Sequence, residues 1–517
     1  MIALSGRSTA ARVVRNSLAN YGGNIVGLAA GFFLTPFLVR SLGDTGYGAW
    51  ILVGSISSYF WLLDFGLGAS VTKFVSELKA TGDRARLNAV VSSSFALLAI
   101  VGIVAFVVSC GVAQMVDRFF VLPEDLVADV QTMIVVTGVA LLVSFPLGVF
   151  GGALRGYQRY DILNLIVIIT TIVNTALSIL VVQQGFGLVG LAVVGLVTNL
   201  LVGGGRWVCA RWVDSELTLS PSLVRIAVLR EITNFSAWVF VINLATQVVY
   251  RSSPIIIAAI LGVALVTPFA LANSLIQYLR RLVDPILAVL LPAYAELSAV
   301  DDTERVRRLF VGGSRAVGAI SLPMVLAMVL LGRPFIDLWV GEGYEQTGLL
   351  LVLLAPPLFL SFLVAAGDKL LWAKGKVRVN SYVAIADTVL NLGLSIILTL
   401  AIGLPGVALA TLISVLTTNG LWLMPYICRE AGLPARDYLT RVLLPIFVPA
   451  VPATAVVLLL APVFGVGGYM PLALLGACCA ASYWGTYLAL NARTETFALL
   501  ASLRSRLVGR RLVADAP

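Results

Sequence analysis

The sequence predicts an all-α membrane protein with about fourteen transmembrane helices. Hydrophobic residues make up 59% of the 517 positions, charged residues make up 12%, and the mean hydropathy is +0.99. A chain with so few polar residues cannot cover a soluble surface of this size. Apolar stretches of about 20 residues, long enough to cross a bilayer, recur almost from end to end. We therefore expect lipid to be its main solvent.

Each span is predicted from an apolar stretch bounded by charged loops or by loops that contain Gly and Pro. The first stretch is too long for a cleavable signal peptide, so we interpret it as a true span. The long seventh and eighth spans contain Pro254 and Pro285, where we expect bends. The predicted spans are 18–39, 47–70, 90–113, 127–152, 162–182, 188–209, 232–261, 263–294, 311–331, 349–372, 379–402, 406–427, 442–462 and 469–489.

The distribution of basic residues predicts the orientation. If the N-terminus is cytoplasmic, outer loops hold only Arg40, Arg118 and Arg333, three more arginines fall within spans, and all the rest of the 35 Lys and Arg lie on inner segments. Basic residues collect on the cytoplasmic side of membrane proteins. This asymmetry predicts a multi-pass protein of the cytoplasmic (inner) membrane with both termini cytoplasmic. The formal charge of +9 then needs no nucleic-acid partner, because basic inner loops lie beside anionic lipid headgroups.

A weak internal repeat has an offset of about 219 residues. Leu42-Gly43 matches Leu261-Gly262, Gly156 matches Gly375, and Asn174 matches Asn391 at an offset of 217. Six spans per copy is an even number, so both copies enter the membrane in the same orientation. We predict an N-terminal six-helix lobe (1–212), a C-terminal six-helix lobe (213–430), two additional helices (431–492) and a basic cytoplasmic tail (493–517). The two additional helices are a candidate for forming a groove for a long lipid tail.

Charges deep in the bilayer are the sharpest functional signal, because each costs several kcal/mol unless it is paired or hydrated. Arg251 lies near the midplane of the seventh span, and Arg280 and Arg281 lie in the middle of the eighth. Arginine's planar fork suits phosphate or pyrophosphate. These arginines outnumber the nearby carboxylate, so we predict a cationic cavity for an anionic substrate. The alternative for Arg280 is a structural salt bridge with Asp284 one turn away.

Helical spacing places polar side chains on stripes that could line a hydrated cavity. Asn273 and Gln277 share a stripe with Arg280 and Asp284 on the eighth span, and Gln247 shares one with Arg251 on the seventh. Asn24 belongs to a polar face of the first span, where helix contacts are an equally good explanation.

Three aspartates have two readings. Asp64 and Asp284 occupy matching places in the repeat and precede bends, whereas Asp387 lies one turn from Asn391. Each could bind a coupling cation, either H+ or Na+, or could instead lock neighbouring groups in place, and we favour the structural role.

The sequence does not predict an enzyme. It contains no histidine, no carboxylate cluster with metal-ligand spacing and no nucleotide-binding motif. We expect no metal and no cofactor beyond a coupling ion.

Several motifs resemble those of one family of membrane proteins. They are RSLGDTGYG (40–48), LDFGLG (63–68), KFVSE (73–77), RGYQ (155–158), GLVG (187–190) and GEGY (341–344). Together the chain resembles the polysaccharide-synthesis (Wzx-type) flippases of the multidrug/oligosaccharidyl-lipid/polysaccharide exporter superfamily. It differs from lipid II flippases in lacking a basic residue in the apolar core of its first span.

The resemblance implies two lobes around a cavity and alternating access by rocking of the lobes. It implies translocation of an undecaprenyl-pyrophosphate-linked oligosaccharide to the outer leaflet for surface polysaccharide or exopolysaccharide biosynthesis, with a polymerase and assembly proteins as partners. Arg251, Arg280 and Arg281 fall on helices where the family has basic cavity residues. Two alternatives remain, a cation-coupled multidrug or small-molecule exporter of the same superfamily and a membrane scaffold without transport. The glycan, the energy source and the oligomeric state are left open.

Overall fold

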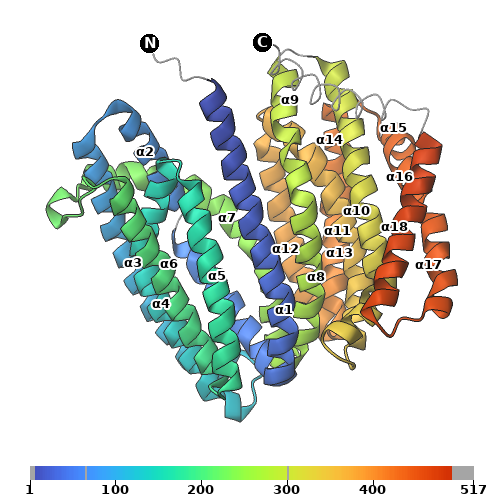
Figure 1. The fold of residues 1–517 in the computed structure, drawn as a ribbon, viewed down its shortest axis with the longest axis horizontal. Coiled ribbons are helices and arrows are strands. Elements are labelled where there is room, and N and C mark those ends of the chain that lie inside the picture. Colours follow the sequence, from blue (N-terminus) through green and yellow to red (C-terminus); the bar gives the residue numbers. More distant parts are fainter. Residues whose placement is uncertain (1–5, 65–66, 300–301, 492–517) are drawn as a thin grey trace, which may run out of the picture. The chain divides into compact units, whose positions relative to one another are not determined.

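A computed structural model describes residues 6–64, 67–299 and 302–491, and all regular structure in these segments is helical (Figure 1). The side chains of 6–21, 24, 62, 64, 234–250 and 377 are outside the description. The predicted tail at 493–517 also lies outside the described residues. The chain divides by its contacts into two compact units, Met1–Ala270 and Leu271–Pro517. The all-α membrane fold class is confirmed.

The first unit is built from long helices joined by short connections. Its α4 packs against α2, α3 and α6, and α5 packs against α1 and α6. The elements are α1 (Gly6–Phe60), η1 (Trp61–Asp64), α2 (Leu67–Thr81), α3 (Arg84–Phe119), α4 (Glu124–Gly156), α5 (Tyr160–Gln183), α6 (Gly187–Val213), η2 (Pro221–Leu223), α7 (Ile226–Ile260) and η3 (Val263–Leu265).

The second unit begins within α8 (Val266–Ala288). Its α10 packs against α11 and α18, α12 packs against α13, and α17 and α18 lie side by side (Figure 1). The remaining elements are α9 (Leu290–Ala299), α10 (Thr303–Trp339), α11 (Glu345–Ala373), α12 (Val377–Ile402), α13 (Pro405–Val415), η4 (Leu416–Leu423), α14 (Met424–Glu430), α15 (Ala435–Tyr438), η5 (Leu439–Leu443), α16 (Leu444–Phe447), α17 (Ala450–Phe464) and α18 (Tyr469–Asn491).

Twelve helices among the described residues are long and apolar enough to cross a membrane. The difference from the fourteen predicted spans arises at α1 and α7. The first candidate, Ile25–Phe60, covers parts of the first two predicted spans, which meet at a kink at Gly43. The predicted seventh span coincides with α7, of which Arg251–Ile260 forms a shorter apolar helix. The second predicted span is also interrupted, because α1 ends at Phe60 and η1 follows.

Local geometry matches between positions that the repeat aligns. Gly43 and Gly262 both have positive φ, 69° and 98°. Asn174 donates to Thr198 across α5 and α6, and Asn391 donates to Thr411 across α12 and α13, with N···O distances of 3.0 and 3.2 Å. In each unit the aligned asparagine thus forms a hydrogen bond between corresponding consecutive spans. This match is expected if the two units arose by duplication.

The first unit extends beyond the lobe boundary predicted at 212/213. Helix α7 contacts α1, α2 and α3, so the contacts assign it to this unit. The division of the chain into functional lobes therefore stays a prediction. Its predicted parts are 1–212, 213–430 and the extra segment 431–492.

A buried carboxylate ties three helix ends together in the first unit. Asp214, which follows α6 and is 7% exposed, accepts hydrogen bonds from Tyr157 at 2.6 Å and from Arg84. Burial acts to raise the pKa of Asp214, but the Tyr157 and Arg84 hydrogen bonds and the Arg84 charge outweigh it and hold this pKa below its usual value. Glu216 also approaches Arg84, at 3.4 Å, but its side chain is 71% exposed.

We expect Asp214→Asn to lower the free energy of unfolding by about 1–3 kcal/mol, because two hydrogen bonds lose their charge. The measurement is thermal unfolding in detergent, with Glu216→Gln as the control, since an exposed pair contributes about 0–1 kcal/mol. Because the pKa of Asp214 is lower in the folded state than in the unfolded state, its ionised carboxylate stabilises the fold at pH values above the pKa of the unfolded state. This stabilisation is lost as the pH falls and the carboxylate is protonated. The difference between wild type and Asp214→Asn should therefore shrink below about pH 4. Equal effects from both variants would contradict this role.

A close backbone contact requires glycine at position 48. A Cβ added to Gly48 would lie 2.0 Å from the Val263 carbonyl oxygen, whereas a Cβ at Gly54 on the same helix meets nothing within 4 Å. We expect Gly48→Ala to destabilise the protein by about 1–3 kcal/mol through backbone displacement. Gly54→Ala is the control and should be neutral or slightly stabilising. Thermal unfolding of the two variants in the same detergent measures the difference, and similar melting temperatures would refute it.

Candidate functional site

Helix α8 has a buried apolar face and a polar face. Ile276, Val283 and Leu287 are buried. Asn273, Gln277 and Arg280 are half-buried, whereas Arg281 and Asp284 are exposed. The four stripe residues predicted for this helix therefore lie off its buried face.

Charged groups from α8 and α11 lie close together in the second unit. The Asp284 carboxylate experiences the charges of Arg280 and Lys369, which attract it. Next to Lys369, the half-buried Asp368 accepts a hydrogen bond from Asn380 of α12. Asp284 and Asp368 thus offset two cations, and the exposed Arg281 adds a further positive charge on α8.

Asp368 is a residue that sequence reasoning missed. The sequence places it beside Lys369 near the end of an apolar span. Charged residues are common at the ends of spans, so this position alone does not indicate a functional residue. Only the approach of α12 shows that the carboxylate is partly buried and hydrogen-bonded.

The other predicted site residues are placed less completely. Arg251 is exposed on α7, in the first unit. The side chains of Asn24, Asp64 and Gln247 lie outside the described residues. Whether Arg251 and Arg280 serve one site stays a prediction.

Asp387 lies in a buried network of hydroxyl and amide groups. Asp387 and Asn391 are 8% and 7% exposed. Thr418 donates to the Asp387 carboxylate at 3.0 Å, and Asn391 donates to Thr411 and Ser414, each at 3.2 Å. The donors that reach this carboxylate are hydroxyls from the next span. Such a network can lock α12 against α13 and η4, and it could also hold a small cation or a proton.

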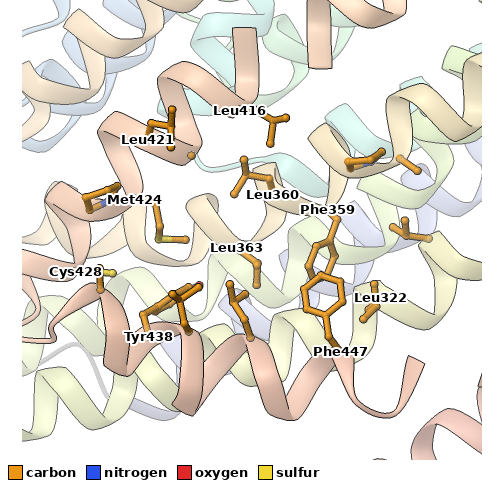
Figure 2. Close-up of a pocket in the computed structure, with 18 of the residues that line it drawn as sticks. Leu322, Phe359, Leu360, Leu363, Leu416, Leu421, Met424, Cys428, Tyr438 and Phe447 are labelled. Atoms are coloured by element: carbon orange, nitrogen blue, oxygen red, sulfur yellow. The ribbon is translucent and has the colours of Figure 1, made fainter. Parts of the chain in front are cut away.

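An apolar groove of about 740 Å³ lies in the second unit (Figure 2). Phe359 and Phe447 meet edge to face across it, with ring centroids 5.4 Å apart. The segments η4 and η5, which both line the groove, are π-helical. The labelled lining residues are Leu322, Phe359, Leu360, Leu363, Leu416, Leu421, Met424, Cys428, Tyr438 and Phe447. A volume of this size matches sites for small organic ligands.

The groove uses the first of the two additional helices. Tyr438, Leu443 and Phe447 come from the segment 435–464, which contains the thirteenth predicted span. The same helix α11 carries groove residues Leu360 and Leu363 and then Asp368 and Lys369 of the charged cluster. The second unit therefore presents an apolar groove and a charged cluster on one helix.

The apolar spans, the polar face of α8 and the apolar groove together define a multi-pass membrane protein. The polysaccharide biosynthesis protein family matches residues 50–348, more than half of the chain, and the chain belongs to that family. A second family, described as lipid II flippase MurJ, matches residues 285–475.

Two curated relatives are similar in sequence. The uncharacterized membrane protein EpsK of Bacillus subtilis (strain 168) is 22% identical over 450 residues, covering 83% of this chain and 86% of EpsK. The lipopolysaccharide biosynthesis protein WzxC of Escherichia coli (strain K12) is 26% identical over 214 residues, covering 41% of this chain and 43% of WzxC.

Two solved structures share the fold. The lipid II flippase MurJ in an inward closed conformation has a TM-score of 0.71 at 14% identity, covering 93% of this chain and all of MurJ. An inward-facing multidrug resistance MATE family transporter of the MOP superfamily has a TM-score of 0.63 at 16% identity, covering 79% of this chain and 96% of the transporter. The predicted resemblance to the polysaccharide-synthesis branch of this superfamily is confirmed.

Proposed function

We propose that this protein is a flippase that moves an undecaprenyl-pyrophosphate-linked oligosaccharide from the inner to the outer leaflet of the cytoplasmic membrane. The observation that carries the proposal is the arrangement on α11, where apolar groove residues are followed by the charged cluster. A polyprenyl tail needs an apolar surface, and a pyrophosphate needs cationic donors. Membership of the polysaccharide biosynthesis family supports a glycan as the cargo.

Arg280, Arg281 and Arg251 would bind the pyrophosphate, while Asn273 and Gln277 would face the hydrated path. The groove would take part of the lipid tail. Alternating access would expose this site to each side of the membrane in turn, with both termini in the cytoplasm. A polymerase and assembly proteins would receive the exported glycan.

Asp387 would serve as the coupling group if transport is driven by H+ or Na+. Its carboxylate is buried and reached by the Thr418 hydroxyl of η4. Because Leu416 and Leu421 of η4 line the groove, a change of charge at Asp387 would act on the groove wall.

The cationic site is tested by gene deletion and complementation. We expect the deletion strain to accumulate the lipid-linked oligosaccharide on the cytoplasmic face and to lose the matching surface polysaccharide. Arg280→Ala or Arg251→Ala should restore export at most about one tenth as well as wild type at normal protein abundance, because a lost charge-assisted contact costs at least ~1.4 kcal/mol.

The matched control is Arg305→Ala. Arg305 forms an exposed i,i+3 pair with Asp302, with the arginine side chain 66% exposed, and should be dispensable. Normal export from both cavity variants would remove the cationic mechanism. Intact surface glycan in the deletion strain, together with new sensitivity to cationic drugs, would favour the multidrug exporter. Loss of glycan without accumulation of its lipid-linked precursor would favour a scaffold.

The groove is tested separately by filling it. Leu360→Trp or Leu363→Trp should reduce export several-fold, roughly in proportion to the lost volume, because a tryptophan occupies space needed by the lipid tail. Ile397→Trp is the control, since Ile397 lies outside the groove lining and is 62% exposed on α12. Surface polysaccharide normalised to protein abundance measures the effect, and equal export from all three variants would exclude the groove.

A further inference from the structure

Two arginines of the first unit, Arg155 and Arg206, lie near each other on neighbouring helices. Arg155 is the penultimate residue of α4, and Arg206 lies seven residues before the end of α6, about 10 Å along the helix axis. Both are half-buried, and the charge of Arg155 acts on Arg206. Their helices are close neighbours.

Glycine at position 151 allows this approach. A Cβ added to Gly151 would lie 3.3 Å from Arg206 Cδ and 3.4 Å from its Nε. Gly151 and Arg155 are one turn apart on α4, so the Arg206 side chain crosses α4 on the turn that precedes Arg155. The absence of a side chain at Gly151 therefore leaves space for the Arg206 guanidinium close to the turn that carries Arg155.

The donors of this pair are incompletely used. Arg155 Nε donates to Thr72 Oγ1 at 3.3 Å. The Nε of Arg206 is buried and has no acceptor among the described residues. An unmet buried donor destabilises the fold, and the donors of a structural arginine are normally paired with a carbonyl or a carboxylate.

Carboxylates near this end of the unit are engaged elsewhere. Asp214 accepts from Arg84 and Tyr157, and Asp161 pairs with Arg159 at 3.0 Å. Within the described parts of the chain, no carboxylate forms an ion pair with Arg155 or Arg206. Two like charges on adjacent helices therefore repel each other in a partly desolvated place.

We propose that Arg155 and Arg206 form a binding site for a phosphate-bearing anion, with Thr72 positioning Arg155. An anion would satisfy the Arg206 donor and cancel the repulsion, and paired guanidinium forks match phosphate oxygens. The charge asymmetry of the sequence predicts that this end of α4 and α6 lies on the cytoplasmic side. The phosphate could belong to a phospholipid headgroup or to a soluble phosphate or pyrophosphate. This site is separate from the α8 residues assigned to the transported substrate.

Binding to the purified full chain tests the proposal. The protein in uncharged detergent is titrated with sodium pyrophosphate in one arm and with phosphatidylglycerol in the other, and the rise in melting temperature gives an apparent Kd. Sodium chloride at equal ionic strength and phosphatidylcholine are the blanks. We expect Arg206→Gln and Gly151→Ala to raise this Kd roughly tenfold or more.

Three variants make the result specific. Gly148→Ala, on the same helix with nothing within 4 Å of the added Cβ, should bind like wild type. Arg305→Ala, which removes an exposed arginine of the second unit, should also bind like wild type. Arg155→Gln provides a second test if Arg206→Gln does not fold, as judged by gel filtration.

Each arm has a defined meaning. Binding of pyrophosphate alone assigns the site to a soluble phosphate, and binding of phosphatidylglycerol alone assigns it to a lipid headgroup. Binding of both supports the phosphate chemistry common to them. The proposal is overturned if neither raises the melting temperature, or if the Arg206, Arg155 and Gly151 variants bind as well as wild type. Wild-type binding by the Arg206, Arg155 and Gly151 variants would leave the flippase proposal untouched, because these residues are not assigned to the transported substrate.

Discussion

Hydrocarbon offers no hydrogen-bond partner, and this constraint determines most of the structure. Backbone groups that cross the membrane must be satisfied within helices, which explains why regular structure in the described residues is entirely helical. The same constraint makes polar side chains informative, because each needs a partner, water or a ligand. Asp214 accepts hydrogen bonds from an arginine and a tyrosine, and Asp387 accepts one from a threonine hydroxyl. The Nε of Arg206 has no acceptor among the described residues.

The fold class and the helices followed from apolar length and charge asymmetry, because the bilayer fixes both. Breaks within helices were harder to predict. Gly43 has the non-helical backbone angles φ 69° and ψ 175°, so the first two predicted spans meet at a sharp kink where the sequence predicted a loop. Pro285 was expected to bend its helix, and α8 ends three residues later at Ala288.

The candidate site was predictable only in part. Helical spacing was enough to group Asn273, Gln277 and Arg280 on one side of α8, because that grouping depends on one helix alone. Asp368 and Arg206 needed tertiary contacts, since a charge near a span end resembles a topology signal until a second helix is seen beside it. The groove likewise involves residues more than 100 positions apart, from Leu322 to Phe447, which no local pattern connects.

The π-helical segment η4 has a consequence for how the groove could have arisen. A π turn holds an extra residue compared with an α turn, and each α-helical residue corresponds to a rotation of about 100°. Because the extra residue is contained within the π-helical turns, one residue could be removed from Leu416–Leu423 with Met424 and Cys428 still facing the groove. Thr411 and Ser414 would also stay with Asn391. A single-residue insertion in an ancestral helix would thus have widened the turns that border the groove without rotating either flanking segment.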